Sequence, residues 1–149
     1  MSPPILTILG IALLIALGLV GRSLIGGKQR RPARPGVTLN ELMITLDPYL
    51  RAGQGSRRLK ISITESGPFI TLYDMSGEKA VIFEDPEDNA DRAARVDEVA
   101  TTHTGRRIEP DADDGLHYAF AEPDGLRRFL DELLWSDYER TTIHSLQES

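Results

Sequence analysis

The chain of 149 residues contains no cysteine. Disulfide frameworks and thiol chemistry are therefore excluded, and this absence fits a cytoplasmic domain. Three site patterns are also missing: the phosphate-binding P-loop, the dinucleotide-binding glycine pattern and the G-x-S-x-G nucleophile turn. The histidines His103, His117 and His144 lack the spacing of a metal motif. We therefore predict no catalytic residue, no cofactor and no enzymatic activity.

Acidic residues are absent from the N-terminal part of the chain, where the first is Glu41. Residues 5–20, ILTILGIALLIALGLV, carry no charge at all. Together with the flanking residues, this run reaches the ~20 residues that a membrane-spanning helix needs. The alternative is a cleaved signal peptide, which needs a positive charge before the run and a small-x-small cleavage site after it. Residues 1–4 have no charged side chain and no such site is convincing, so we predict a retained transmembrane anchor over residues 1–27.

Positive charge follows the apolar run on one side only, at Arg22, Lys28, Arg30, Arg31 and Arg34. Basic residues next to a membrane helix mark its cytoplasmic side. We therefore expect a single-pass protein of the cell membrane, with its N-terminus outside and the rest of the chain in the cytoplasm. Residues 28–36 contain two prolines and a glycine and are interpreted as a short basic linker that meets anionic lipid headgroups.

Small residues form a stripe on the predicted anchor. At ~100° per residue, one narrow face of the helix contains Thr7, Gly10, Leu14, Gly18 and Gly21. Small side chains let another helix approach closely, and such packing is a main source of association energy in lipid. Glycine and alanine are also common in membrane helices generally, and the spacing is not a strict G-x-x-x-G. The stripe predicts contact with other membrane protein subunits.

Charge and length limit what the rest of the chain can be. Residues 36–149 contain all 23 acidic residues and 12 of the 17 basic ones, a net charge of −11. Nucleic acid is not expected as the main partner, because phosphate binding needs a positive surface. The length suits one modest hydrophobic core. We therefore predict a single acidic domain over residues 37–149.

Hydrophobic periodicity predicts the elements of this domain. Thr38 and Glu41 have the spacing of a helix capping box, and leucines recur at helical spacing up to Leu50, with a kink expected at Pro48 and a cap at Asp47. Strict alternation predicts a strand within residues 58–65, and two further strands are expected at 69–73 and 79–84. The short turns between these strands favour an antiparallel sheet. The rest of the predicted elements are a helix ending near residue 103, strands at 106–108 and 117–121, and a helix from residue 123.

The predicted fold class is therefore α+β, in the order α-β-β-β-α-β-β-α with an antiparallel sheet. This element order resembles that of the small α+β domains of type III secretion chaperones.

Two acidic runs and one glycine-containing run are candidate binding sites. The run from Glu84 to Asp91 has the oxygen ligands of a calcium loop. If an EF-hand loop began at Asp85, its required glycine and glutamate would be Ala90 and Val96 instead. A helix start, capped by Asp88 or Asn89, is the favoured interpretation. The acidic residues between 109 and 114 are interpreted as a solvated loop. Residues 53–58, GQGSRR, suggest a phosphate cradle, but a plain helix-to-strand turn is favoured.

Trp135 is the aromatic residue with the clearest functional signal. On the last predicted helix it points away from the leucine-rich face, and tryptophan is enriched at interface hot spots. We predict that it binds a partner, with one alternative: the C-terminal tail, through Ile143 and Leu146, folds back over it.

Together these features predict a non-catalytic, single-pass accessory or assembly subunit of a larger membrane protein complex. Its helix would pack against other membrane subunits, and its domain would cover their cytoplasmic surfaces. The alternative is a membrane-tethered adaptor or chaperone-like module that binds soluble client proteins.

Overall fold

The computed structural model describes residues 32–149 except 54, 56, 110–114 and 138–141. The predicted anchor, its small-residue stripe from Thr7 to Gly21 and the basic residues from Arg22 to Arg31 lie outside this part of the chain. Within the described part, no helix has both the length and the apolar character needed to cross a membrane.

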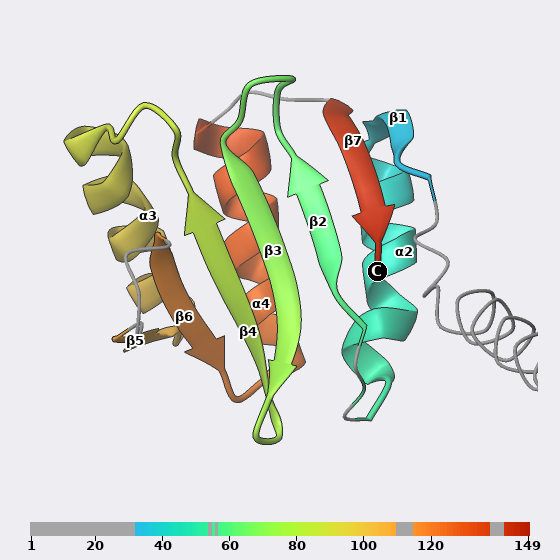
Figure 1. Cartoon of the computed structure of the whole chain (residues 1–149). Coiled ribbons are helices and arrows are strands. Elements are labelled where there is room, and N and C mark those ends of the chain that lie inside the picture. Colours follow the sequence, from blue (N-terminus) through green and yellow to red (C-terminus); the bar gives the residue numbers. More distant parts are fainter. Residues whose placement is uncertain (1–31, 54, 56, 110–114, 138–141) are drawn as a thin grey trace, which may run out of the picture.

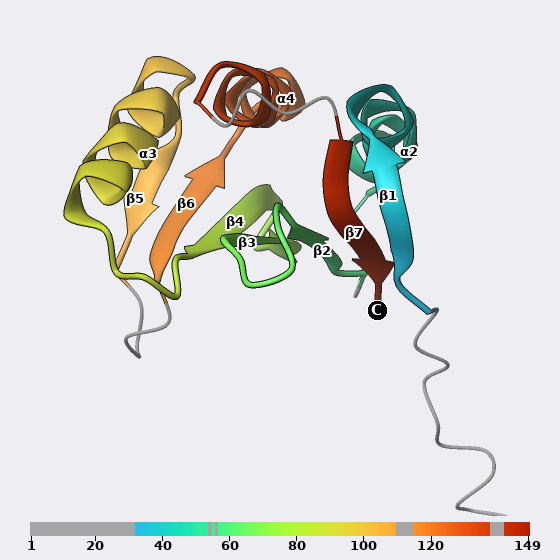
Figure 2. The same cartoon turned by 90° about the horizontal axis from the view of Figure 1, so that it is seen from above.

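The domain is an antiparallel sheet covered by helices on one face (Figures 1 and 2). The helices are α2 (Leu39–Arg51), α3 (Ala90–Thr102) and α4 (Pro123–Asp131), and α4 continues into the π-helical segment η1 (Glu132–Asp137). The strands, in the spatial order β1-β7-β2-β3-β4-β6-β5, are β1 (Arg34–Thr38), β2 (Leu59–Ser62), β3 (Phe69–Met75), β4 (Glu78–Glu84), β5 (Arg106–Ile108), β6 (Leu116–Phe120) and β7 (Thr142–Glu148). The predicted α+β class and antiparallel sheet are confirmed.

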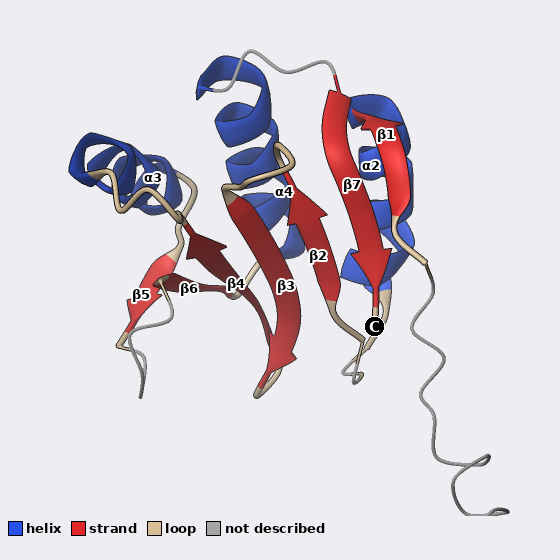
Figure 3. Ribbon diagram, turned by 45° about the horizontal axis from the view of Figure 1, so that its top comes forward, coloured by secondary structure: helices blue, strands red, loops and turns tan. Residues whose placement is uncertain are grey.

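Two strands were missed by the sequence analysis, one at each end of the domain. β1 pairs with β7, and β7 pairs with β2, so the C-terminal strand lies inside the sheet (Figure 3). β1 begins at Arg34, within the range assigned to the linker, so residues 34–36 belong to the sheet. Its Pro35 is compatible with this position because β1 is an edge strand.

Helix α2 shows both a confirmed and a wrong prediction. The capping box is present: the Thr38 hydroxyl accepts a hydrogen bond from the Glu41 amide, and the Glu41 carboxylate accepts one from the Thr38 amide at 2.9 Å. Pro48 was expected to kink or restart the helix; α2 does not restart there but is continuous through it. Asp47 is therefore not a cap; it forms ion pairs with Arg51 and Arg127 at 2.9 and 3.1 Å. The second pair joins α2 to α4.

The core lies between the helices and the sheet. Alternate residues of β2, β3 and β4 point into it, among them Ile61, Ile70 and Phe83, all at most 1% exposed. The predicted apolar face of the last helix meets them, with Leu126, Phe129, Leu130, Leu133 and Leu134 all buried. None of the helices within the described residues lies against the opposite face of the sheet (Figure 2).

Candidate partner-binding surface

Trp135 lies within η1, with 59% of its surface exposed. The two residues before it, Leu133 and Leu134, are buried, so the backbone of this segment is held by the core while the indole faces outward. The predicted outward orientation is confirmed. π-Helical turns are rare and occur frequently at functional sites. An exposed tryptophan on such a turn is therefore a strong candidate for a contact residue.

The C-terminal tail does not cover Trp135. Ile143 and Leu146, expected in the alternative to fold over it, are each 1% exposed as part of β7 and contribute to the core of the sheet. That alternative was wrong because both side chains are used to join β7 to its neighbours: Val37 pairs with Ile143, and Ile61 with Leu146.

A shallow groove of about 350 Å³ runs between α2 and α4 beside this tryptophan's helix. Its lining consists of Met43, Asp124, Arg127, Arg128 and Asp131. Trp135 follows Asp131 by four residues, which places the two on the same side of the α4–η1 rod. The groove therefore offers a half-buried methionine and charges of both signs next to an exposed aromatic ring. A hydrophobic centre with a polar rim is typical of protein–protein interfaces.

A polar cluster fixes η1 against α3. Glu132 is the first residue of η1, and its carboxylate lies 2.6 Å from Nε2 of His103, the C-terminal cap of α3. Arg95 donates a second hydrogen bond to Glu132 at 3.0 Å. The hydrogen bond from His103 lowers the pKa of Glu132, with further contributions from the charges of His103 and Arg95 that outweigh the opposing effect of burial. This cluster holds the base of the segment that presents Trp135.

We predict that Glu132→Gln lowers stability in a pH-dependent way. The folded state depresses the pKa of Glu132 below its usual value of 4.5, so its stabilising effect is present above pH 4.5 and is lost as pH falls through the folded-state pKa. The difference in melting temperature between parent and variant should be largest above pH 5 and shrink at lower pH. Calorimetry at several pH values measures this difference, and a constant difference between pH 3 and 7 would contradict it.

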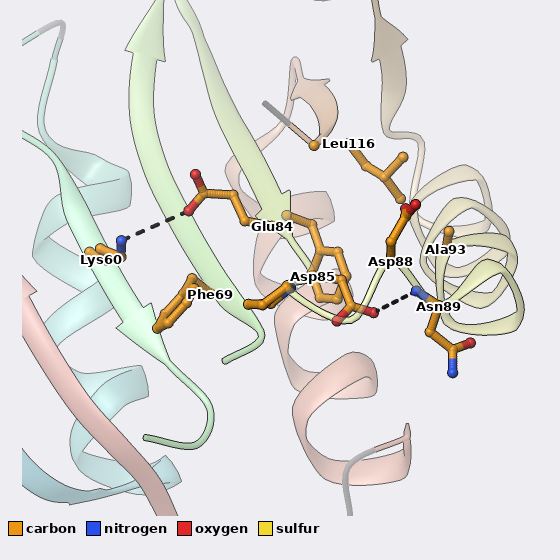
Figure 4. A pocket seen from close by; sticks show the side chains of 11 residues that line it. Lys60, Phe69, Glu84, Asp85, Asp88, Asn89, Ala93 and Leu116 are labelled. Atoms are coloured by element: carbon orange, nitrogen blue, oxygen red, sulfur yellow. Dashed lines mark hydrogen bonds and ion pairs between the residues drawn. The ribbon is translucent and has the colours of Figure 1, made fainter. Parts of the chain in front are cut away.

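The acidic run after β4 is a helix start, as predicted. Asn89 caps α3 by accepting a hydrogen bond from the Arg92 amide at 3.0 Å. Asp85 accepts hydrogen bonds from the amides of Glu87 and Asn89 and from the Arg92 guanidinium. Figure 4 shows Asp85 and Asn89 on the wall of an open pocket of about 820 Å³, which is also lined by Lys60 and Glu84, an ion pair of 3.9 Å. The Asp85 oxygens are already used within the fold.

No group of histidine, aspartate or glutamate side chains within the described residues is arranged to hold a metal ion. His103 is at a helix end, as predicted, and His117 is near the start of β6. His117 is 9% exposed, and its Nε2 atom has no hydrogen-bond partner within the described structure. His144 is exposed in β7. The structure therefore does not bring the three histidines into one site.

A buried ion pair was missed by the sequence analysis. Lys79 and Asp74 face each other across the β3–β4 hairpin with Nζ and Oδ1 2.5 Å apart, and their side chains are 10% and 8% exposed. The Tyr49 ring lies 4.5 Å from the Lys79 ammonium. Burial, and then the Asp74 charge, raise the pKa of Tyr49. The cluster joins the end of α2 to the hairpin and serves stability.

Comparisons of the chain with protein-family models, curated proteins and solved structures give no match.

Proposed function

We propose that the protein is a non-catalytic, single-pass membrane protein that acts as an accessory or assembly subunit of a larger membrane protein complex. The anchor over residues 1–27 packs against partner helices, and the domain extends into the cytoplasm and covers a partner surface there. A C-terminal reporter that is active only in the cytoplasm tests this orientation, and its activity solely in an extracytoplasmic compartment would exclude it.

One observation carries the proposal: Trp135 is 59% exposed on a π-helical turn whose neighbouring leucines are buried. A tryptophan offers a large contact area with few torsions to order, so it contributes strongly when a partner covers it. The adjacent α2–α4 groove supplies charged residues that would form the rim of such a contact.

A second candidate function is a membrane-tethered adaptor or chaperone-like module for soluble client proteins. The location of Trp135 on the domain, rather than on the anchor, favours it. The two candidates differ in where the affinity comes from. A subunit depends on its transmembrane stripe, whereas an adaptor retains its client without the anchor.

Substitutions in the stripe test the first candidate. We expect Gly18→Leu to reduce the amount of partner that co-purifies in mild detergent, because it adds bulk where a partner helix would approach closely. Leu13→Ile is the control, since it changes a residue outside the stripe at constant volume. Equal recovery of partner with both variants would show that the stripe does not contribute to assembly.

A further inference from the structure

A second groove, of about 400 Å³, lies at the edge of the domain where β1 begins. Three arginines line it: Arg34 from β1, and Arg57 and Arg58 from the segment that leads into β2. Tyr49 and Thr45 of α2 form part of its wall, and Glu148 of β7 supplies an acidic side chain. Figure 1 shows β1, the end of β7 and α2 side by side at this edge.

None of the three arginines forms an ion pair with a carboxylate of the described residues. Other exposed arginines of the described residues do so, since Arg51 pairs with Asp47 and Arg106 with Glu78, whereas Arg128 in the α2–α4 groove does not. Arg34 donates a long hydrogen bond of 3.5 Å to Thr45 and interacts electrostatically with the Glu41 carboxylate, and Arg58 lies 5.9 Å from the Tyr73 ring. Three guanidinium groups line the groove together with two carboxylates, those of the Glu148 side chain and of the Ser149 terminus, so a small excess of positive charge remains there.

Arginine around a concave surface suits one class of ligand well. Its planar guanidinium donates two parallel hydrogen bonds to phosphate, and it is less strongly hydrated than the lysine ammonium. The sequence of residues 53–58 suggested a phosphate cradle, but in the structure the arginines and not the glycines are the main feature of the groove. The structure adds Arg34 and the wall of α2, which the local sequence pattern did not include.

The position of the groove indicates where such a phosphate comes from. Arg34 follows the predicted anchor closely: the seven residues from Lys28 to Arg34 span at most ~25 Å when extended. The groove can therefore reach the headgroup layer on the same side of the membrane. We infer that this arginine groove binds the phosphate of an anionic lipid headgroup and so orients the domain on the bilayer. This inference rests on the membrane tether of the proposed function.

The net charge of −11 of residues 36–149 does not prevent this contact. At physiological ionic strength, charges are screened beyond ~8 Å, so acidic residues at other edges repel the membrane only weakly. Each arginine near an anionic surface contributes attraction that corresponds to roughly a fivefold change in binding. The groove thus favours one edge of the domain toward the lipid, while Trp135 is presented by the helix layer.

The full chain in lipid nanodiscs provides the test, and the absence of cysteine allows single-site labelling. Gly53→Cys is suitable for a fluorophore four residues before Arg57, in the segment that leads into β2, because a side chain there meets no atom within 4 Å. Ser66→Cys labels the exposed turn between β2 and β3, at the opposite end of the sheet (Figure 1). Quenching by a headgroup-labelled nitroxide lipid is compared in discs of phosphatidylcholine alone and with phosphatidylglycerol added.

We expect phosphatidylglycerol to increase quenching of the label at Gly53 and not of the label at Ser66. The double variant Arg57→Gln with Arg58→Gln should bind the lipid surface roughly 25-fold more weakly. The double variant Arg57→Lys with Arg58→Lys keeps both charges and should retain most of this binding. Arg128→Gln is the matched control: Arg128 is exposed and forms no ion pair with a described carboxylate, but it lies in the other groove. Both arginines of the pair are exposed, so a melting curve should verify that the double variant folds.

Several results would overturn the inference. Equal quenching in the two kinds of disc, or an equal effect of the double variant and of Arg128→Gln, would show that the groove does not bind lipid phosphate. A rise in melting temperature with inorganic phosphate, compared with chloride at equal ionic strength, without any lipid dependence would assign the groove to a free anion instead. Failure of the chain to insert into discs would overturn the tether and this inference together, whereas insertion without lipid dependence overturns this inference alone.

Discussion

Replacing Trp135 with alanine is expected to lower partner binding by roughly 30-fold and to leave the melting temperature nearly unchanged. An interface hot spot contributes ~2 kcal/mol or more, which corresponds to that loss of affinity. The side chain is 59% exposed, so its removal takes little from the core. Two quantities are measured on the full chain in mild detergent: the melting temperature by calorimetry, and the amount of partner retained in a pull-down.

Two control substitutions make this result specific. Ile44→Ala removes the other large exposed apolar side chain, which is 65% exposed on α2 and outside the α2–α4 groove, and it should change neither quantity. Phe129→Ala, at a fully buried position on α4, should cost ~3–5 kcal/mol of stability. A melting loss for the Trp135 variant as large as that of the Phe129 variant would assign Trp135 to the core, and unchanged partner retention would remove it from the interface.

The second large effect is expected at the buried ion pair. Asp74→Asn should destabilise the domain by ~3–5 kcal/mol, because it leaves the Lys79 ammonium buried without a counter-charge. The remaining neighbours of that ammonium, the Tyr49 ring and the Ala52 carbonyl oxygen, do not replace a carboxylate.

Asp47→Asn serves as the comparison, since it removes two exposed ion pairs, with Arg51 and Arg127, each of which contributes ~0–1 kcal/mol. A double replacement, Asp74→Leu with Lys79→Met, should recover most of the stability, because an apolar pair carries no unpaired charge. If the Asp74→Asn and Asp47→Asn variants have the same melting temperature, the Lys79–Asp74 pair does not contribute as a buried ion pair.

Local sequence patterns predicted the elements whose residues follow a regular period. β2 alternates strictly, the leucines of α2 and α4 repeat at helical spacing, and the capping box at Thr38 depends only on residues within one turn. These signals are local, and the structure agrees with them.

The two missed strands have no such signal. In β7 the buried residues Ile143 and Leu146 are three positions apart, which breaks the alternation of a strand. β1 buries only Val37, and its proline and glycine suggested a linker. Both strands form because each finds a partner distant in sequence, and periodicity does not report such pairing.

The candidate surfaces were partly predictable for the same reason. The outward direction of Trp135 follows from helix geometry, whereas no local residue pattern indicates its π-helical turn. The arginine groove combines Arg34 with Arg57 and Arg58, which only the pairing of β1 with β7 and of β7 with β2 brings to one edge. The Lys79–Asp74 pair likewise depends on the register of the hairpin.

Photo-crosslinking from position 135 in intact cells tests the central claim most directly. A benzoylphenylalanine at position 135 should form one discrete adduct with an integral membrane protein, whereas the same group at position 44 should form none. An adduct with a soluble protein would favour the adaptor instead of the subunit. The absence of any adduct at position 135 beyond that at position 44 would contradict the proposal that Trp135 marks the partner-binding surface.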